Sequence, residues 1–149
     1  MPTTPSPRNP NFEADVRTNF ALQGIMTLIE AEMTSVAPGA VEISVTPRAD
    51  LSQQKGYTHA GVVTTIVDSA CGYAALTLAP AGSDVLTVEF KANFMAPASG
   101  ERLIARGRVI RSGRTITVCA GDVYALRDGE EHHIAVMQAT MMLMSGKSA

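Results

Sequence analysis

One stretch decides the fold of this chain: Gln53-Gln-Lys-Gly-Tyr-Thr-His-Ala-Gly-Val-Val-Thr-Thr-Ile-Val-Asp-Ser-Ala-Cys-Gly-Tyr-Ala-Ala75. It begins with polar and turn residues and becomes a nearly uncharged helical pattern from about Thr58. Pro80 and Gly82 end the pattern, since neither residue favours a helix interior. A helix that is apolar almost all round packs in the middle of a domain. The stretch therefore predicts a long central helix.

Asp68 is the one acidic or basic residue in this apolar run. On a helical wheel of about 100° per residue it shares a face with small residues, while the large apolar residues point the other way. The residues on its face are Gly61, Thr64, Thr65, Cys71, Gly72 and Ala75, and those opposite are Val62, Val63, Ile66, Ala70 and Tyr73. Small residues allow a second helix, a second chain or a ligand to come close.

A carboxylate is seldom buried without a partner, and no Lys or Arg lies at helical neighbour spacing from Asp68. Two interpretations are open: a hydrogen-bonded structural acid at a helix contact, or a functional carboxylate. We favour the functional carboxylate, because an acid with no local cation is a typical feature of a reactive site.

The start of the predicted helix, Thr58 to Gly61, carries backbone N–H groups with little side-chain cover at the positive end of the helix dipole. Such an end binds an anion or polarises a carbonyl oxygen. Ala60 and Asp68 lie about 12 Å apart along the helix axis, at a rise of 1.5 Å per residue. One small reacting group cannot touch both. If both are catalytic, they serve different sites, or each site takes one end from each of two subunits.

Composition narrows the class of protein. With 149 residues, of which 46% are hydrophobic and 17% charged, the chain is expected to form one globular domain over residues 1–149. A net charge of -2 excludes a basic nucleic-acid surface, and no apolar run reaches the length of a membrane span. Two distant cysteines without a pairing framework favour a reducing, cytoplasmic location. Residues 1–11, rich in Pro, Thr, Ser and Asn, are predicted to be a flexible arm.

The rest of the chain predicts further helix and mainly strands. A helical pattern runs from Phe12 to Met33, and Gly24 weakens its middle, so that two short helices are possible. A turn at Pro38-Gly39 precedes a strand over 41–47. Four more strands are predicted over 87–94, 102–111, 114–126 and 132–144, with hairpin turns at Ser112-Gly113 and Asp128-Gly129.

Hairpin links produce an antiparallel sheet, so the predicted fold class is α+β, with one long helix against a curved antiparallel sheet of about five strands. Within strand 87–94 the alternation places Val88, Phe90, Ala92 and Phe94 on one face. An open sheet has edges that must be covered, and joining the sheets of two subunits is one way to do so.

This order of elements resembles the hotdog fold, and the central stretch is similar to the motif of the PaaI-like acyl-CoA thioesterases. That motif has an amide residue, His-Gly-Gly six positions on, and an acid nine positions after the His. Gln53, His59-Ala60-Gly61 and Asp68 stand at those spacings, and the resemblance covers roughly residues 41–144. It implies a hydrolase of acyl-CoA thioesters that works as a homodimer or homotetramer. It implies no metal and no cofactor beyond the coenzyme A of the substrate.

The resemblance also implies residue roles. Asp68 would act as nucleophile or general base, and Gln53 would orient substrate or water. Thr87 would assist the attacking water, and His59 would shape the helix start and contact the thioester.

At the helix start, the amides of Ala60 and Gly61 would hold the thioester oxygen. The chain departs from the family pattern at two positions. Ala60 replaces the first Gly of the pair, and Gly72 stands where the related arylacyl-thioesterase branch often has a hydroxyl. These departures bear on the acyl group, which the sequence leaves open between medium aliphatic and aryl-acetyl chains.

Several arginines cluster between residues 102 and 114, and two interpretations of them are open. The cluster is either a solvated sheet edge or a contact with coenzyme A phosphates, for which Arg111 and Arg114 are the candidates. Cys71 is predicted to be a small buried thiol, because no histidine lies at helical neighbour spacing from it, and Cys119 is predicted to be a core residue of a strand.

Two rival functions on the same fold remain. One is a non-catalytic acyl-CoA or fatty-acyl binding protein. The other is a hotdog dehydratase, which would need a different arrangement of His and acid.

Overall fold

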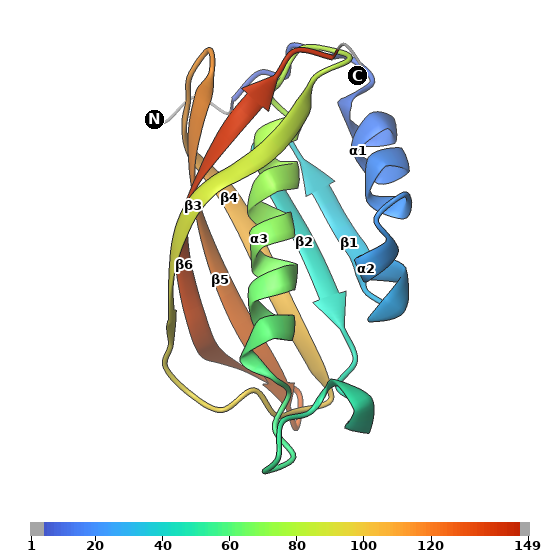
Figure 1. The fold of residues 1–149 in the computed structure, drawn as a ribbon, viewed down its shortest axis with the longest axis vertical. Coiled ribbons are helices and arrows are strands. Elements are labelled where there is room, and N and C mark those ends of the chain that lie inside the picture. Colours follow the sequence, from blue (N-terminus) through green and yellow to red (C-terminus); the bar gives the residue numbers. More distant parts are fainter. Residues whose placement is uncertain (1–4, 147–149) are drawn as a thin grey trace.

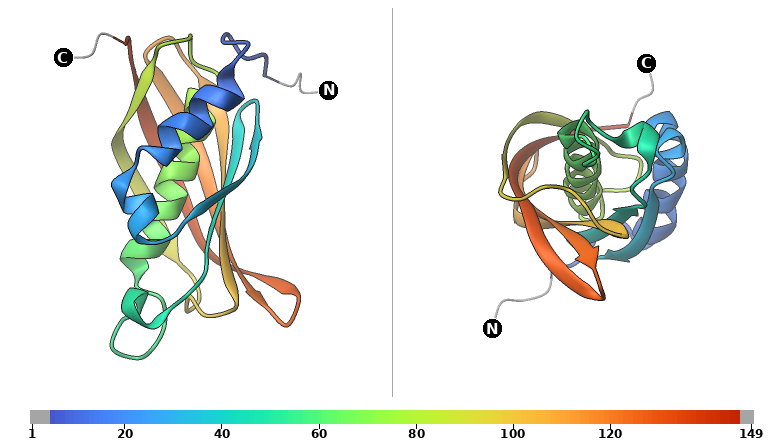
Figure 2. Two further views of the ribbon diagram at one scale, coloured as in Figure 1. Left: turned by 90° about the vertical axis from the view of Figure 1, so that its right-hand side faces the viewer. Right: turned by 90° about the horizontal axis from the view of Figure 1, so that it is seen from below.

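The computed structural model describes residues 5–146, and in it a six-stranded antiparallel sheet curls around one long helix. Figure 1 shows this helix, α3, lying along the concave face of the sheet, with α1 and α2 beside it. The end-on view of Figure 2 shows that the sheet closes around α3 on one side while α1 and α2 flank it on the other. The elements in chain order are α1 (Phe12–Ala21), α2 (Gly24–Leu28), β1 (Glu32–Ala37), β2 (Ala40–Val45), a short 3₁₀ turn (Ala49–Leu51), α3 (Ala60–Leu76), β3 (Asp84–Phe94), β4 (Arg102–Ser112), β5 (Ile116–Arg127) and β6 (Glu130–Met144). This is the predicted α+β hotdog architecture.

The strand order is β1-β2-β4-β5-β6-β3, so β1 and β3 form the edges of the sheet. The predicted hairpin between β5 and β6 is confirmed: Asp128 and Gly129 both have positive φ, at 50° and 80°. Positive φ at both central residues is what a two-residue turn needs to match the twist of the strands it joins.

The helix α3 packs so closely on the sheet that the strands below it must lack side chains. Gly107 of β4 and Gly121 of β5 are register partners under the helix. A Cβ at Gly107 would lie 2.3 Å from the backbone of Ala70, and a Cβ at Gly121 would lie 2.4 Å from the side chain of Val67. The close contact buries one side of α3 completely and leaves the opposite side, with Asp68, toward solvent.

The first edge strand was not foreseen, and it raises the strand number from about five to six. Residues from Glu32 to Ala37, assigned in part to a helix, form β1 and pair with β2 across the turn at Pro38-Gly39. The helical pattern ends earlier, at a chain reversal where Glu30 has a φ of 55°. The break near Gly24 is real: α1 ends at Ala21 and α2 starts at Gly24.

The predicted arm over residues 1–11 lies partly outside the described residues. Within the described part, Asn9 is buried and its side-chain amide donates a hydrogen bond of 2.7 Å to Asp15 on α1. The side-chain oxygen Oδ1 of Asn9 accepts a hydrogen bond from the backbone N–H of Asn11 at 2.9 Å. The chain is therefore anchored just before α1. Across residues 5–146 no helix combines the length and apolar character needed to cross a membrane.

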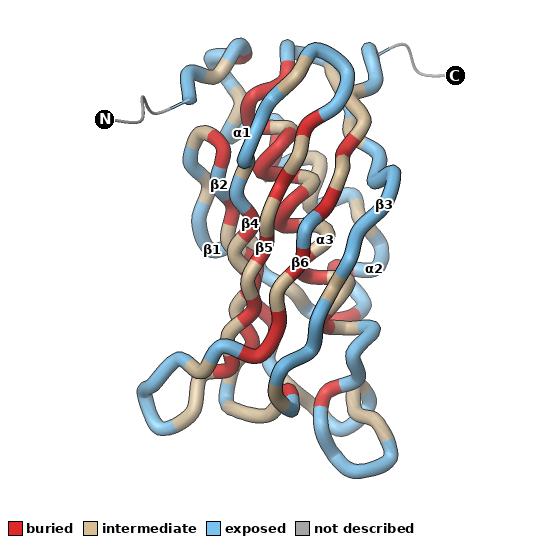
Figure 3. The backbone as a smooth tube through the Cα atoms, turned by 90° about the vertical axis from the view of Figure 1, so that its left-hand side faces the viewer, coloured by how far each residue is buried: buried red, intermediate tan, exposed pale blue. Residues whose placement is uncertain are grey.

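The edge strand β3 carries unusual exposed apolar surface. Figure 3 shows it as an almost continuously exposed strand beside the buried middle of the sheet. Its side chains Val88, Phe90 and Phe94 are 53%, 44% and 50% exposed. Phe90 and Phe94 stand opposite Ala139 and Ala135 of β6, which are buried under α3, so both aromatic rings lie on the concave face.

Candidate active site

Asp68 lies on the solvent side of α3, where its carboxylate oxygen Oδ1 accepts a 2.8 Å hydrogen bond from the hydroxyl of Thr87 on β3. No ion pair to Asp68 forms within the described part of the chain. The acid is half-buried in the single chain rather than fully buried. The structure therefore places Thr87, predicted to assist the attacking water, at hydrogen-bond distance from Asp68, and among the described residues the carboxylate has no neutralising cation.

A β-bulge brings Thr87 to Asp68. The register between β3 and β6 shifts between Thr87 and Glu89. Without a shift, residues 87 and 90 would point to opposite faces of the sheet. With the bulge, Thr87 stands opposite the buried Met141, and Phe90 stands opposite the buried Ala139, so both lie on the concave face. Bulges commonly re-aim a side chain beside an active site in this way.

Burial raises the pKa of the Asp68 carboxyl above its ordinary value, and the hydrogen bond from Thr87 opposes that rise. Burial is the larger effect, because removing a carboxylate from water disfavours its charged form. The carboxylate is therefore a stronger base than a solvated aspartate.

The face of α3 around Asp68 differs in part from the predicted one. Gly61, Thr64, Thr65 and Gly72 are accessible as expected, but Cys71 and Ala75 are buried at 0% and 1% exposure. These two residues lie at the border of the accessible face, and the curved sheet encloses more of the helix than a flat sheet would. Burial raises the pKa of the Cys71 thiol far above its ordinary range and that of Cys119 to about 12, so both are inert thiols, as predicted.

The start of α3 is capped by its own histidine. His59 is the N-cap residue, and its Nδ1 accepts a 2.8 Å hydrogen bond from the backbone N–H of Gly61. Because Nδ1 is the acceptor, the neutral ring carries its proton on Nε2. The predicted role of His59 in shaping the helix start has this geometric basis.

The two amides assigned to the thioester oxygen are not equivalent. The Gly61 N–H is occupied by His59, whereas the Ala60 N–H has no hydrogen-bond partner among residues 5–146. Ala60 is also exposed. One free amide at the positive end of a helix is therefore available to a ligand oxygen here, and it belongs to Ala60.

Gln53 reaches the helix start through a tight loop. Its backbone N–H donates to the carbonyl of Tyr57 at 2.8 Å, and its side-chain oxygen accepts from the backbone N–H of Lys55. The loop is closed by a β-bridge between Ser52 and Thr58. A shallow pocket in front of the helix is lined by Gln53 and Ala60 together with apolar side chains that include Phe94 and Ile134.

The predicted catalytic residues thus fall into two groups on one chain. Asp68 and Thr87 line one pocket, and Gln53 and Ala60 line another. The two groups are separated by about 12 Å of helix, so a single thioester cannot contact both within one chain.

The arginine cluster divides into paired and unpaired members. Arg102 bonds Glu32 at 2.6 Å, Arg106 bonds both Glu42 and Glu131, and Arg108 bonds Asp122 at 3.1 Å. All four ion pairs join strands of the sheet and are structural.

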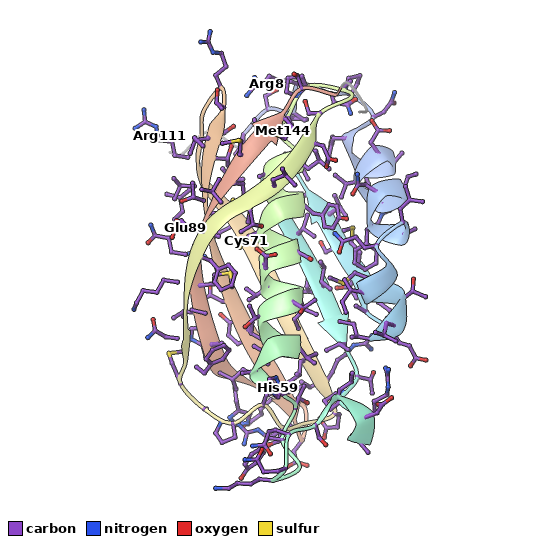
Figure 4. The ribbon with its side chains drawn as sticks, viewed as in Figure 1. Arg8, His59, Cys71, Glu89, Arg111 and Met144 are labelled. Carbon is purple, nitrogen blue, oxygen red and sulfur yellow. The ribbon has the colours of Figure 1, made fainter. Side chains whose placement is uncertain are left out.

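Arg111 and Arg114, the two residues predicted to contact coenzyme A, are exposed and form no ion pair within the described residues. Both lie at the hairpin that joins β4 to β5. Figure 4 places Arg111 near the end of the molecule opposite to His59. Their role in binding coenzyme A stays a prediction.

Comparison with known proteins adds a decisive observation to this geometry. The family model described as the thioesterase superfamily matches residues 55–132, just over half of the chain. The chain belongs to the thioesterase superfamily. The matched region runs from the loop before α3 to the start of β6, so it contains Ala60, Asp68 and Thr87.

Solved structures and curated proteins agree with this membership. A thioesterase family protein from Silicibacter pomeroyi is 47% identical, with a TM-score of 0.89 over 91% of this chain and 99% of that one. A candidate esterase of Thermoplasma volcanium is 30% identical over 117 residues, which are 78% of this chain and 85% of that protein. The PaaI protein of the E. coli phenylacetic acid degradation operon is 15% identical, with a TM-score of 0.81 over 92% and 96% of the two chains, a likeness that shows the fold alone. This thioesterase-superfamily chain is therefore a hydrolase of the hotdog type.

The sequence did not reveal that α1 contributes to the pocket of this thioesterase-superfamily chain. The pocket beside Asp68 is lined also by Asn19 and Gln23, which precede α3 by about forty residues or more. The hydroxyl of the buried Tyr73 joins them, because it accepts from Gln23 Nε2 at 2.7 Å and donates to Asn19 Oδ1 at 3.0 Å. The available signal was two amide side chains four residues apart, Asn19 on α1 and Gln23 at the start of α2, and nothing local tied them to Tyr73.

Proposed function

We propose that the chain hydrolyses acyl-CoA thioesters to a free acid and coenzyme A, with Asp68 of one subunit and Ala60 of its partner acting on the same thioester. One observation carries the proposal. The same helix holds a carboxylate without a cation, Asp68, which Thr87 orients, and a free backbone N–H, that of Ala60, but the two groups are too far apart to act on one substrate within one chain. The function requires both groups, and two chains can bring them together.

In the proposed reaction Asp68 acts on the thioester carbonyl carbon. As general base it removes a proton from water, whose oxygen attacks that carbon, while the Ala60 N–H donates a hydrogen bond to the developing oxyanion. The C–S bond then breaks, and the leaving sulfur takes the proton from Asp68. As nucleophile, Asp68 would instead attack that carbon, the C–S bond would break, and coenzyme A would leave as a thiolate that takes a proton from water; a second water then cleaves the resulting anhydride into the free acid and Asp68. Neither route needs a metal or a further cofactor, because a thioester is already reactive.

The edge strand β3 supports a specific way of joining the two chains. Thr87 lies near one end of β3 and Phe94 at the other, so β3 passes both half-sites. In a symmetric dimer each surface meets itself, with residue i against residue j and j against i. Antiparallel pairing of two β3 strands about their middle would set Thr87 of one chain near Phe94 of the other. The Asp68 pocket would then face the Ala60 pocket, and the exposed rings of β3 would be covered.

We also propose how the coenzyme A part of the substrate binds, how many subunits assemble and where the protein acts. Arg111 and Arg114 would bind phosphates of coenzyme A through charge-assisted hydrogen bonds. The assembly would be a homodimer or a homotetramer, in the cytoplasm, without a nucleic-acid or membrane partner.

Complementation between two inactive variants tests the shared site. Asp68→Asn removes the base, and Ala60→Pro removes the free N–H at a helix position where proline is well tolerated. After co-refolding equal amounts of the two, about a quarter of the parent activity should return, because half of randomly paired dimers are mixed and each mixed dimer holds one intact site. Release of free thiol from a panel of acyl-CoAs measures the activity.

Two outcomes would count against the proposal. If each variant alone is inactive and the mixed sample stays inactive although mixed dimers are present, the two groups do not share a site. If the parent protein binds acyl-CoA tightly but releases no thiol, the chain is an acyl-CoA binding protein, the rival function on this fold.

A further inference from the structure

The pocket beside Asp68 is more polar than a binding site for a plain hydrocarbon chain would be. Along α3 it runs from Asp68 to Leu76, and its other side is closed by Asn19 of α1 and by Gln23, the residue just before α2. Tyr73 holds these two amide side chains in place through its hydroxyl. Its ring is fixed in turn by Phe20, which packs edge-on at a centroid distance of 5.9 Å. The polar groups are therefore built into the structure rather than free to rotate away.

Several hydrogen-bonding groups in this pocket lack a partner. Among the described residues, neither the Asn19 NH₂ group nor the Gln23 side-chain carbonyl forms a hydrogen bond, and the same holds for the Ser69 hydroxyl. The pocket thus offers both donors and acceptors to a ligand. A purely apolar ligand would cover these groups without satisfying them, which costs binding free energy.

The charge of the pocket excludes the coenzyme A end of a substrate. Its lining, all within the described residues, includes the carboxylates of Asp68 and Asp84 and no Lys or Arg. A polyphosphate would be repelled there, as would an acyl group ending in a carboxylate. A neutral acyl group is the part of an acyl-CoA that fits.

Gly72 leaves the pocket open one turn beyond Asp68. A Cβ built at this position meets nothing within 4 Å, so the position is free of packing contacts in the single chain. Any larger side chain at this position would project into the space that an acyl group extending from Asp68 would occupy. The absence of a side chain at Gly72 is therefore a feature of the pocket.

We infer that this pocket binds the acyl group and selects acyl chains that carry a neutral hydroxyl several bonds from the thioester. The hydroxyl would meet Asn19 and Gln23 near Tyr73, which lies about 7.5 Å beyond Asp68 along the helix axis. Asn19 and Gln23 are specificity-determining residues in this scheme, and Gly72 sets the room available. The inference rests on the proposed function for its substrate class, acyl-CoA thioesters.

A matched pair of substrates tests the inference: 6-hydroxyhexanoyl-CoA and heptanoyl-CoA, which differ by a hydroxyl in place of a methyl group. The parent protein should show a kcat/KM about tenfold higher for the hydroxylated ester. Gln23→Met and Asn19→Leu, alone and together, should reduce this preference to less than about threefold, chiefly by slowing the hydroxylated ester. Gln138→Met, the same change on the convex face of the sheet, should leave the preference as it is in the parent.

A second variant keeps the test independent of the folding of the Asn19 and Gln23 variants. Gly72→Val should lower kcat/KM progressively with acyl length, more for heptanoyl-CoA than for acetyl-CoA. Circular dichroism and size-exclusion chromatography check that each variant retains the fold and the assembly.

Binding measurements separate this inference from the proposed function. Calorimetry on Asp68→Asn gives the Kd of both esters without turnover, and we expect the hydroxylated ester to bind more tightly unless Gln23→Met is added. If the parent hydrolyses nothing but this binding preference holds, hydrolysis fails and the pocket inference stands. If heptanoyl-CoA binds and reacts as well as its partner, or if the Asn19, Gln23 and Gly72 variants leave the ranking unchanged, the inference is overturned while hydrolysis stands.

Discussion

The beginning and the middle of the solvent side of α3 differ in chemistry, although the same helix builds both. The middle of the helix presents a proton acceptor, Asp68, in a polar pocket shared with α1 and the start of β3. The beginning of the helix presents a hydrogen-bond donor, the Ala60 N–H, in a mainly apolar pocket shared with the end of β3. Acyl transfer from a thioester needs an acceptor and a donor at one carbonyl group.

In the proposed enzyme, each chain carries two complementary halves of a site and holds them apart. A rigid helix fixes the separation at about 12 Å, which no side-chain movement removes. The exposed apolar strand β3 is the element common to both halves. In the proposed dimer, pairing of two β3 strands would cover the exposed apolar side chains at this edge of the sheet.

Loss of the Asp68 carboxylate should lower the rate of hydrolysis more than any other change predicted here. Asp68→Asn keeps the size of the side chain and its contact with Thr87 but removes the base. We expect kcat to fall by roughly a thousandfold and KM to change little, because general-base catalysis contributes about 10² to 10⁴. Steady-state release of thiol measures this. Hydrolysis at the parent rate would show that Asp68 is not catalytic.

Loss of the donor half should have the next largest effect. Ala60→Pro deletes one N–H at the first position of the helix, and His59 before it already has the extended backbone that precedes a proline, with φ -60° and ψ 139°. We expect kcat to fall about a hundredfold at unchanged thermal stability, in the range found for loss of one oxyanion donor. Ala60→Gly, which keeps the N–H, should retain most of the activity. If Ala60→Pro and Ala60→Gly lower kcat equally, the methyl group of Ala60 rather than its N–H is the important group.

The hydrogen bond from Thr87 should have a smaller effect, and one that depends on pH. Because the ionised form of Asp68 is active, kcat should rise with pH through the pKa of Asp68. Thr87→Val removes the bond that lowers this pKa, so the acid limb of the profile should move to higher pH, with about a tenfold loss of rate on its steep part. Thr87→Ser should keep the parent profile. If the acid limb of the pH profile lies at the same pH in Thr87→Val as in the parent, a group other than Asp68 determines that limb.

The smallest effect on activity is expected from Arg111 and Arg114, which lie far from both half-sites. Arg111→Gln combined with Arg114→Gln should raise KM for acyl-CoA about threefold to tenfold and leave kcat unchanged, with a difference that fades at high salt. Arg17→Gln, on the outside of α1, is the matched control. If KM for acyl-CoA and for the corresponding acyl-pantetheine respond equally, phosphate contact is not the cause.

Much of the central motif could be predicted from local sequence. The isolated charge at Asp68, the turn residues before Thr58 and the glycine at 61 are signals of the helix itself, and they predicted His59 at the start of α3 and Asp68 within it. The hairpin at Asp128-Gly129 was equally local, since those residue types suit positive φ. In contrast, β1 was missed because its residues continue an apolar helical spacing and become a strand only by pairing with β2.

By itself, then, the sequence determined the elements whose signals lie within a few residues: the apolar helix, its solitary acid, its bare start and the hairpins. Only the tertiary structure decided which distant groups meet these elements. The bulge in β3 turned Thr87 toward Asp68, His59 occupied the Gly61 amide and left that of Ala60 free, and Tyr73 joined Asn19 and Gln23 into the pocket wall. The reason is physical: helix and turn preferences act between near neighbours along the chain, whereas strand register and side-chain hydrogen bonds depend on residues that only folding brings together.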